Sequence, residues 1–408
     1  MQPPTLLIVL ILLLSPHQNS QPPPVDFYVA PYGDDTNPGT IDRPFKTITK
    51  AYYSSSPGNL IYFRGGKYEP TIINGPVAMD LARNNQGSQK ENIKFWAYPG
   101  EKPVINLSSI QFKGGTIWGV LLSGNYMHWK GFEITGLPAI ASQWVHCALM
   151  LKDCNNCIFE NLTIHDNNGL GLVLGGNSSN NLIVNCDAYN NQDPLTSSDP
   201  YGNADGFHIG VINNPDATNT LRNCRAWYNS DDGFDCYNNE GTVIFENCWA
   251  FFNGYKPETL ESAGDGDGFK LGNSQKSYKS IKRILKGCIS ARNKLTGIDL
   301  NDGMFEVQLE HCLCYKNGNH GIYINKYNMA NNIINCISFD NGSGYNALIS
   351  KESSIINCSW QGFNITQNSF VNTDIQKLRN SRNIDNDLPI NEFLKLSPSS
   401  NFKFKKQP

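Results

Sequence analysis

The sequence lacks a large excess of charge of either sign, because 33 Lys and Arg residues face 36 Asp and Glu residues, a formal net charge of −3. It also has no basic stripe and no recognised nucleic-acid-reading motif, so nucleic acid is not an expected partner. A polyanion would have to be held by local groups, since bulk charge would not attract it. Past the first residues, no stretch is long and apolar enough to cross a membrane. These absences argue against a nucleic-acid-binding or membrane-spanning protein.

One apolar run does occur, at the N-terminus, where Thr5–Leu14 contains no charged residue. The run is too short to span a bilayer and fits the hydrophobic part of a signal peptide, although Met1–Pro4 lacks the usual basic residues. We predict a signal peptide over residues 1–20 and a secreted, extracellular mature chain, with a buried N-terminal strand as the alternative. Six Asn-x-Ser/Thr sequons are compatible with a secreted glycoprotein: Asn106, Asn161, Asn177, Asn341, Asn357 and Asn364.

The remaining chain is internally repetitive. Segments that begin at Asn185, Asn223 and Asn247 all read Asn-Cys-x-Ala, followed by aromatic residues and Asn. Consecutive cysteines of the series are 38, 24, 40, 24, 24 and 22 residues apart. A unit of 22–24 residues therefore repeats, with loop insertions in its longer copies. Looser copies of the unit start at Cys288, Cys312, Cys336 and Cys358.

Each unit holds three short apolar segments that alternate with polar residues, such as Thr242–Phe245, Cys248–Phe251 and Gly268–Leu271. Alternation with period two is typical of strands. Three strands in so short a unit predict an all-β fold, a single-stranded right-handed parallel β-helix. A leucine-rich repeat would need a Leu-x-x-Leu-x-Leu pattern, and a propeller about 40 residues in every repeat. We expect a monomer with a β-helix domain over 26–375 and a C-terminal extension over 376–408.

Cysteine occurs about once per unit, and a secreted chain with 12 Cys could contain disulfides. One Cys at the same inward position of each coil instead favours mostly reduced, stacked thiols that fill the core. Some disulfides, or a metal site, are the alternatives. The predicted cysteine column is Cys186, Cys224, Cys248, Cys288, Cys312, Cys336 and Cys358. A second column is expected to satisfy backbone groups at a turn: Asn229, Asn253, Asn293, Asn317 and Asn341.

A second repeated pattern carries charged groups. Asp-Gly-Phe followed by a polar residue occurs at Asp205–His208, Asp232–Asp235 and Asp267–Lys270. In a solenoid, equivalent residues of successive coils lie about 4.8 Å apart, so outward-pointing side chains form columns. One predicted column on a solvent-facing wall is His208, Asp235, Lys270, Asp299 and Tyr323, and its neighbour is Asp205, Asp232 and Asp267.

Clustered carboxylates repel one another unless a cation neutralises them, and an all-oxygen, carboxylate-rich site suits Ca²⁺. Stacking brings Asp205, Asp232 and Asp235 within reach of one ion, with Asp231 beside them on the turn. Lys270, one coil further on, is then a candidate base. A lone Asp-Gly would indicate only a tight turn. That interpretation does not account for the alignment of the acidic residues with a lysine.

The segments that carry this pattern, Asn223–Asp235, Glu246–Gly254 and Gly266–Gly272, resemble the pectate lyases of polysaccharide lyase family 9. The start, Phe27–Thr40, and the tail, Leu388–Leu396, are similar as well, so the resemblance covers nearly the whole mature chain. It implies a right-handed parallel β-helix and a calcium-dependent lyase acting on polygalacturonate. It would make Lys270 the Brønsted base, and the calcium ligands would be Asp205, Asp231, Asp232 and Asp235.

Two residues depart from the family pattern. Asp267 stands where Asn is expected and is predicted to add a negative charge near Lys270, and His208 replaces what is often a small or basic residue. Neither change removes a catalytic group. We expect effects on substrate preference or on pH dependence.

The implied reaction also follows from the chemistry of a 4-linked uronate. Removing its C5 proton creates a second negative charge, which a divalent cation on the carboxylate offsets. The base must be uncharged, and free lysine titrates near 10.4, so it needs a lowered pKa or an alkaline medium. β-Elimination then expels the oxygen at C4 and leaves an unsaturated uronide.

Two other functions stay open. A β-helix glycoside hydrolase acting on polygalacturonan would use two carboxylates and no lysine. A calcium-binding adhesive or carbohydrate-binding solenoid would keep the acidic cluster without depending on Lys270. Arg225, Arg292 and Lys294 are candidate substrate-binding bases or ordinary surface charges. Endo or exo action, tolerance of methylated pectin and preference between homogalacturonan and rhamnogalacturonan are also open.

Overall fold

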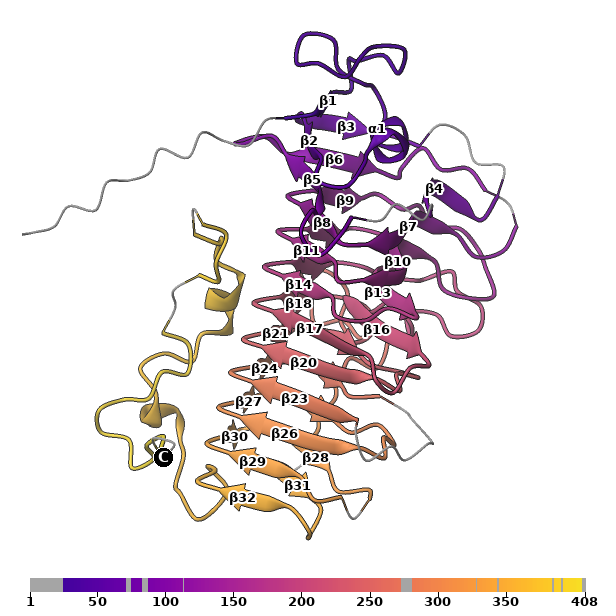
Figure 1. The fold of residues 1–408 in the computed structure, drawn as a ribbon. Helices are drawn as coiled ribbons and strands as arrows, with labels where there is room; N and C mark the ends of the chain where they lie inside the picture. The colour runs from indigo at the N-terminus through magenta and orange to yellow at the C-terminus, as the bar shows by residue number, and fades with distance from the viewer. Residues whose placement is uncertain are drawn as a thin grey trace, which may run out of the picture.

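Three parallel sheets wind around one elongated core (Figure 1). The predicted signal peptide lies outside the part of the chain that is described. The computed structural model describes residues 25–70, 75–82, 87–112, 114–272, 281–327, 329–342, 345–383, 385–389 and 392–405.

After the first strand of the chain, the strands divide among the sheets in a strict rotation. The first sheet contains, in spatial order, β1 (Phe27–Val29), β2 (Leu60–Phe63), β5 (Ile93–Ala97), β8 (Met127–Lys130), β11 (Ile158–Glu160), β14 (Leu182–Val184), β17 (Thr218–Arg222), β20 (Thr242–Glu246), β23 (Lys282–Lys286), β26 (Glu306–Glu310), β29 (Asn332–Ile334) and β32 (Ser354–Ile356). The second contains β4 (Val77–Leu81), β7 (Trp118–Asn125), β10 (Cys147–Asn155), β13 (Leu170–Gly176), β16 (Phe207–Ile212), β19 (Phe234–Asp235), β22 (Phe269–Lys270), β25 (Ile298–Asp299), β28 (Ile322–Ile324) and β31 (Ala347–Ile349). The third contains β3 (Gly66–Tyr68), β6 (Pro103–Asn106), β9 (Glu133–Thr135), β12 (Thr163–His165), β15 (Asp187–Tyr189), β18 (Arg225–Trp227), β21 (Trp249–Phe251), β24 (Ile289–Ala291), β27 (Leu313–Tyr315) and β30 (Ile337–Phe339).

Each coil contributes one strand to each sheet, and every strand pairs in parallel with its counterparts one coil away. The coil β17–β18–β19, for example, is followed by β20–β21–β22 in the same three sheets. The predicted parallel β-helix with three short strands per coil is therefore confirmed.

Alternation along the strands builds the core. Within β20, Val243 and Phe245 are fully buried whereas the residues between and beside them are partly exposed. The rings of Phe207, Phe234 and Phe269 stack along the axis with centroids 5.1 and 4.8 Å apart. A buried aromatic side chain in every coil removes a large apolar area from water, so this stack holds the β16–β19–β22 region together.

The cysteines fill the core as free thiols. All twelve are buried and none of them forms a disulfide in the described residues, which confirms the prediction of reduced, stacked thiols. Successive members of the column lie on adjacent coils, and the Sγ of Cys248 lies 3.4 Å from the carbonyl oxygen of Leu221 on the preceding coil. Cys186 makes the same kind of contact with Phe159, and the register aligns Cys186 with Leu162 on the preceding coil, so the column begins at Cys186 as predicted.

The asparagine column satisfies backbone groups, as predicted. The Nδ2 of Asn253 donates to the carbonyl oxygen of Ala226 (3.1 Å) and to the Oδ1 of Asn293 (2.9 Å). Its own Oδ1 accepts from the backbone N–H of Asn229 (3.2 Å) and from that residue's Nδ2 (3.0 Å). Asn191 joins the same ladder one coil earlier.

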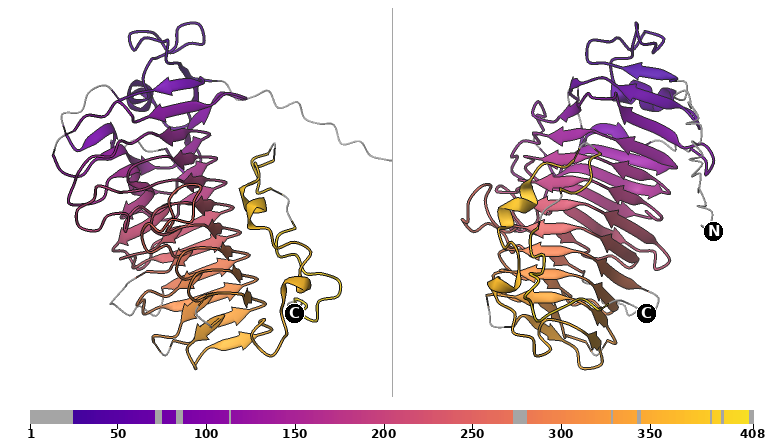
Figure 2. Two further views of the ribbon diagram at one scale, coloured as in Figure 1. Left: turned by 180° about the vertical axis from the view of Figure 1, so that it is seen from behind. Right: turned by 90° about the vertical axis from the view of Figure 1, so that its left-hand side faces the viewer.

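Two elements outside the coils pack on the β-helix. At the N-terminal end, α1 (Ile48–Ser54) starts at Thr47, whose side chain accepts a hydrogen bond from the N–H of Lys50. After β32 the chain turns back and runs along the third sheet, with two short 3₁₀ turns, η1 (Gln367–Ser369) and η2 (Ile375–Arg379) (Figure 2). The boundary at residue 375 stays a prediction.

The returning C-terminal segment corrects one prediction. Arg225 was a candidate substrate-binding base, but it is buried in β18 and pairs with Asp187 at 2.7 Å. It also donates to the carbonyl oxygens of Leu378 (3.0 Å) and Asn380 (2.8 Å). Arg382 binds the same carboxylate at 2.6 Å. Arg225 therefore attaches the C-terminal segment to the third sheet and cannot meet a substrate.

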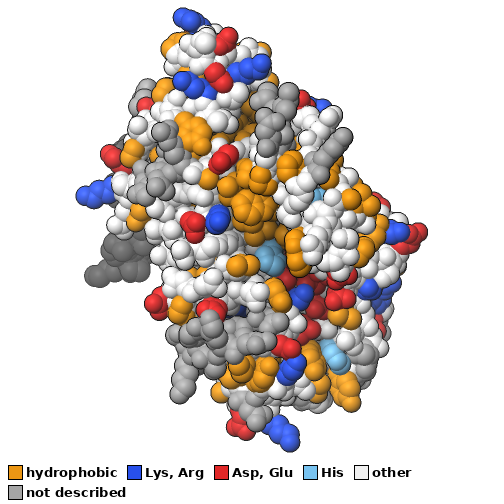
Figure 3. Space-filling view, turned by 90° about the vertical axis from the view of Figure 1, so that its right-hand side faces the viewer, with side chains coloured by type: hydrophobic (Ala, Val, Ile, Leu, Met, Phe, Trp, Pro, Cys, Tyr) orange, Lys and Arg blue, Asp and Glu red, His pale blue; other side chains and the backbone are white. Residues whose placement is uncertain are grey.

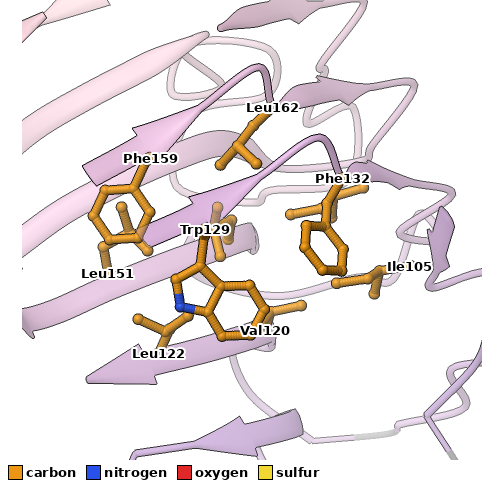
Figure 4. Close-up of a pocket in the computed structure, with 10 residues that line it drawn as sticks. Ile105, Val120, Leu122, Trp129, Phe132, Leu151, Phe159 and Leu162 are labelled. Carbon is orange, nitrogen blue, oxygen red and sulfur yellow. The ribbon is translucent and has the colours of Figure 1, made fainter. Parts of the chain in front are cut away.

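One cavity lies inside the helix near its N-terminal end (Figure 4). It measures about 20 Å³ and is lined by inward-pointing apolar side chains, including Val120, Trp129, Leu151 and Phe159. Such a space is a packing defect of the core and offers no group for binding a charged saccharide. Within the described residues no helix has the length and apolar character needed to cross a membrane.

Candidate active site

Acidic side chains lie on the outer side of the second sheet and at the turns that enter it. The register pairs His208 with Asp235, Asp235 with Lys270, Lys270 with Asp299, and Asp299 with Tyr323. The predicted outward column is therefore confirmed in every step. Figure 3 shows acidic side chains gathered on one face of the molecule, with basic side chains among them.

The neighbouring column of aspartates is linked by its own hydrogen bonds. The Oδ1 of Asp205 accepts the backbone N–H of Asp232 (3.1 Å), and the Oδ1 of Asp232 accepts that of Asp267 (2.6 Å). The Oδ1 of Asp267 accepts from Thr296 at 2.6 Å. Each carboxylate thus has one oxygen fixed by the next coil, which sets the direction of the other oxygen.

The glycines of the three Asp-Gly-Phe turns permit this stacking. A Cβ added to Gly233 would lie 2.8 Å from the carbonyl oxygen of Gly268 and 2.8 Å from the Nδ2 of Asn253. A Cβ on Gly206 would meet the carbonyl oxygen of Gly233 at 2.9 Å. Only glycine allows successive coils to approach this closely at the site, so the repeated Asp-Gly is a requirement of the stacking as well as a turn signal.

Lys270 lies against the carboxylates. Its Nζ is 3.0 Å from the Oδ2 of Asp232 and 3.7 Å from the Oδ2 of Asp235. Its side chain is 19% exposed, so this face of the second sheet is less open to solvent than the prediction of an outward column suggested. The ammonium group is still partly accessible to a substrate. A base and the groups that control its charge therefore occupy one site.

Two overlapping sets of side chains could hold a metal ion. One oxygen each of Asp205, Asp231 and Asp232 lie within 4.8 Å of one another, and so do ligand atoms of Asp205, His208 and Asp235. The Oδ2 of Asp232 is buried and accepts no hydrogen bond from the described residues, so Lys270 is its only described neighbour of opposite charge. Oxygen donors at these separations fit Ca²⁺, whose ligands lie about 2.3–2.6 Å from the ion. The four predicted ligands are thus brought together.

The electrostatics of the site show an excess of negative charge. Burial raises the pKa of Asp205 well above its ordinary value, and the Asp235 and Asp232 carboxylates raise it further. Burial likewise raises the pKa of Asp231 well above its usual range and that of Asp232 to about 6. Burial acts to lower the pKa of Lys270, but the surrounding carboxylates, Asp232 first, outweigh it and raise the pKa. Without a cation, the lysine is the counter-ion of the cluster.

Asp267 lies beside the cluster, and the negative charge expected from it stays a prediction. It is buried, and burial raises its pKa well above the usual value, with further contributions from the Asp232 and Asp299 carboxylates. Its Oδ1 is bound to the backbone N–H of Thr296. The side chain therefore links two coils through this hydrogen bond, and its burial disfavours the charged form.

The other candidate bases lie away from the carboxylates. Arg292 lines a surface hollow together with Phe252, Lys316 and the 373–376 segment of the C-terminal extension. The Nζ of Lys294 donates to the carbonyl oxygen of Gly264. Neither residue contacts the acidic cluster in the described structure, and a role for either in substrate binding stays a prediction.

Sequence reasoning missed two features of the site. His208 was placed in the outward column and noted as a departure from a family pattern, but its contact with the cluster was not predicted: its Nδ1 lies 2.9 Å from the Oδ2 of Asp205. An aromatic group lies two coils beyond Lys270, where the His320 ring stacks on Tyr323 at 5.0 Å and lies 5.9 Å from that of Tyr345. Tyr323 was already in the predicted column. Tyr345 is in a loop outside the repeat, so no alignment of coils could indicate it.

Known proteins share this architecture. Residues 27–319 match the family model described as a Pel9A-like, right-handed β-helix region. The chain is 30% identical over 382 residues to pectate lyase L of Dickeya chrysanthemi, covering 92% of this chain and 84% of the relative. It is 27% identical over 397 residues to pectate lyase PEL9 of Emericella nidulans, covering 90% and 92%.

Two solved structures are similar over most of both chains. A rhamnogalacturonan lyase superimposes with a TM-score of 0.78 at 28% identity, covering 92% of this chain and 97% of that one. Pectate lyase Pel9A superimposes with a TM-score of 0.74 at 26% identity, covering 92% and 90%. Fold and likeness together define a polysaccharide lyase built on a right-handed parallel β-helix. The chain belongs to the Pel9A-like β-helix family, polysaccharide lyase family 9, as its sequence motifs predicted.

Proposed function

We propose that this protein is a secreted, calcium-dependent pectate lyase that cleaves 4-linked polygalacturonate by β-elimination. The observation that carries the proposal is the position of Lys270, whose Nζ lies 3.0 Å from Asp232 and 3.7 Å from Asp235 on an accessible face. An amine at the edge of a carboxylate cluster is well placed to receive a proton from a substrate that is drawn to the same site.

The aspartates would hold the cation. Asp205, Asp231, Asp232 and Asp235 supply oxygen donors, and the buried Oδ2 of Asp232, which accepts no hydrogen bond from the described residues, has the Lys270 ammonium 3.0 Å away as its counter-charge. When bound, Ca²⁺ would neutralise the carboxylate of the uronate and stabilise the negative charge that develops when C5 loses its proton.

Lys270 would act as the Brønsted base. It must be uncharged to accept the C5 proton, and the surrounding carboxylates oppose this by raising its pKa. The lysine can deprotonate only when their charge is compensated, so the charge balance of the aspartates controls the base. The C5–H electrons then form the C4–C5 double bond, and the C4–O bond breaks with its electrons on the leaving oxygen. The products are an unsaturated uronide and a new chain end.

A rhamnogalacturonan backbone is the second candidate substrate. The observation that favours it is the similarity to a solved rhamnogalacturonan lyase at a TM-score of 0.78. The same residues would act on a uronate in either backbone, so the choice depends on the sugars that flank it. A glycoside hydrolase is disfavoured. Hydrolysis of a glycosidic bond uses two carboxyl groups and does not require a lysine such as Lys270 beside them.

A direct assay separates these possibilities. Polygalacturonate and rhamnogalacturonan are each incubated with the protein and calcium, and the absorbance of the unsaturated product is followed before and after addition of a chelator. We expect absorbance on polygalacturonate that stops with the chelator. Cleavage without new absorbance would indicate hydrolysis, and calcium binding without cleavage of either polymer would indicate a binding solenoid.

Secretion rests on the N-terminal apolar run at Thr5–Leu14 and is checked by sequencing the N-terminus of the protein recovered from the medium. The exposure of the sequons indicates which of them could carry a glycan. Asn106 and Asn357 are buried, whereas Asn177 and Asn364 are exposed. We propose that any glycan is attached to an exposed sequon, and that the mature protein is a monomer.

A further inference from the structure

His208 lies on the wall of the proposed cation site. Its Nδ1 is 2.9 Å from the Oδ2 of Asp205 and 3.7 Å from the Oδ2 of Asp235, and its side chain is only 15% exposed. The ligand atoms of these three residues all lie within 4.8 Å of one another. This arrangement is a nitrogen and two oxygens that converge on one space.

The fold reserves room for the imidazole. A Cβ at Gly210 would lie 2.2 Å from the Nε2 of His208, so a larger residue two positions along β16 would displace the ring. Gly210 therefore leaves the space in which the ring lies beside the carboxylates.

A second observation indicates that this space takes a cation. The buried Oδ2 of Asp232 accepts no hydrogen bond from the described residues and lies 3.0 Å from the ammonium of Lys270, so this cluster already attracts positive charge. Asp232 shares Asp205 with the histidine-containing set, and the two sets therefore adjoin.

We propose that His208 is a nitrogen ligand in the cation site and makes the site bind transition ions such as Ni²⁺ and Cu²⁺ more tightly than Ca²⁺. The inference rests on the ion site of the proposed function and extends it to metal selectivity. Calcium prefers oxygen ligands throughout, whereas imidazole suits Ni²⁺, Cu²⁺ and Zn²⁺. Such ions would bind through His208 Nδ1 and the carboxylates of Asp205 and Asp235, and would exclude calcium.

The test compares the wild-type protein with His208→Gln, using the full chain without a polyhistidine tag and freed of metal by a chelator. His311→Gln is the matched control, because His311 is a histidine with a 39% exposed side chain that pairs with Glu310. Ni²⁺ and Ca²⁺ affinities are measured by calorimetry. With one equivalent of Cu²⁺, pulsed electron paramagnetic resonance detects an imidazole nitrogen on the ion.

We expect one Cu²⁺ with imidazole coupling in the wild type and in His311→Gln, and loss of that coupling in His208→Gln. Nickel affinity should fall about tenfold or more in His208→Gln, since even the partners of metal ligands contribute that much. Calcium affinity should change far less. Unchanged nickel affinity, or coupling that persists in His208→Gln, overturns the proposal.

Circular dichroism checks that the variants are folded, and His208→Asn replaces His208→Gln if the latter does not fold. Product formation on polygalacturonate with calcium is measured separately. If the wild type forms no unsaturated product but binds nickel through His208, the proposed function fails and this inference stands. If calcium supports elimination but nickel affinity is the same in the wild type and in His208→Gln, the inference fails and the function stands.

Discussion

At the scale of single residues, the site is governed by uncompensated negative charge. Four buried aspartates and one lysine share a small volume, and the pKa of Lys270 is raised because its carboxylate neighbours outweigh the effect of burial. An amine in these surroundings is a poor base until the carboxylates are neutralised. The chemistry of Lys270 is therefore a property of the whole cluster.

Replacing Lys270 with Ala should remove most elimination activity, since general-base catalysis contributes about 10²–10⁴-fold. Lys270→Arg should not restore it, because a guanidinium stays protonated and cannot accept the C5 proton. The rate of unsaturated-product formation at saturating calcium is the measurement, with Lys90→Ala, at an exposed position, as the control. A Lys270→Ala variant that keeps more than about a tenth of the wild-type rate would show that another group is the base.

Replacing Asp232 with Ala should raise the calcium concentration needed for half-maximal activity. The change removes a buried oxygen that has no described hydrogen-bond donor and lies 3.0 Å from Lys270. Asp216→Asn, at an exposed position, is the control and should behave like the wild type. A calcium titration of activity decides the matter, and an unchanged curve for Asp232→Ala would contradict the assignment of the ligand.

Calcium should stabilise the protein more at pH 8 than at pH 5. Burial raises the pKa of Asp232 to about 6 and raises those of Asp205 and Asp231 well above their ordinary values. Asp232 therefore binds a proton near pH 6 in the folded state, the other two carboxylates hold protons more readily than ordinary ones, and calcium must displace these protons to bind. Thermal unfolding with and without calcium measures the effect. An increase in Tm that is the same at both pH values would argue against these carboxylates as the ligands.

Elimination activity should likewise rise toward alkaline pH. The pKa of Lys270 is raised in the cation-free site, so its neutral fraction grows as the pH increases. Initial rates across pH at saturating calcium give the apparent pKa, which should lie lower than the value measured at limiting calcium. A rate that falls monotonically with rising pH would exclude a neutral amine as the base.

At the scale of elements, the strands that carry the site are very short. β19 and β22 contain two residues each, so their ladder bonds alone hold them weakly. The asparagine ladder at the adjacent turn adds hydrogen bonds between coils that the short strands cannot make. Each side-chain amide bonds both the next asparagine and the backbone of the preceding coil. The precision of the site thus depends on a structural column behind it.

Asn253→Ala should lower the free energy of unfolding by about 2 kcal/mol or more, because it leaves buried groups of Asn229 and Ala226 without partners. Urea unfolding followed by circular dichroism measures the loss. Asn213→Ala, at an exposed position outside the sequons, is the matched control and should change stability little. Equal stability of the two variants would show that the ladder is dispensable.

At the scale of the whole molecule, the C-terminal segment is held along the third sheet by a buried charge cluster. Burial opposes ionisation of Asp187, but Arg225 and Arg382 outweigh it and lower its pKa. Arg225 reaches carbonyl oxygens at Leu378 and Asn380, so strands and segment share one network. The segment therefore covers the third sheet and leaves the acidic face of the second sheet open.

Asp187→Ala should destabilise this attachment, because two arginines remain buried without their anion, at a cost of about 3–5 kcal/mol. Limited proteolysis should then cut the C-terminal segment faster, and the stability of the fold should fall. Asp385→Ala, at an exposed position of the same segment, serves as the control. Unchanged proteolysis of the segment in Asp187→Ala would mean that apolar contacts alone hold it.

The sequence by itself determined the β-helix, the cysteine and asparagine columns and the order of His208, Asp235 and Lys270. It could do so because neighbours in a solenoid are one repeat apart, so that aligning the repeats also aligns the coils in space. The same alignment predicted that Asp205 and Asp232 lie close together in one column.

Only the tertiary structure decided the residues whose partners lie outside the repeat. The prediction that Arg225 could bind substrate was wrong because its partners, such as Leu378, come from a segment that returns across the third sheet. The burial of Asp267 and the contact of His208 with Asp205 depend on side-chain directions at turns. Repetition specifies which residues share a column, whereas burial and long-range contacts, which no repeat encodes, specify what those residues do.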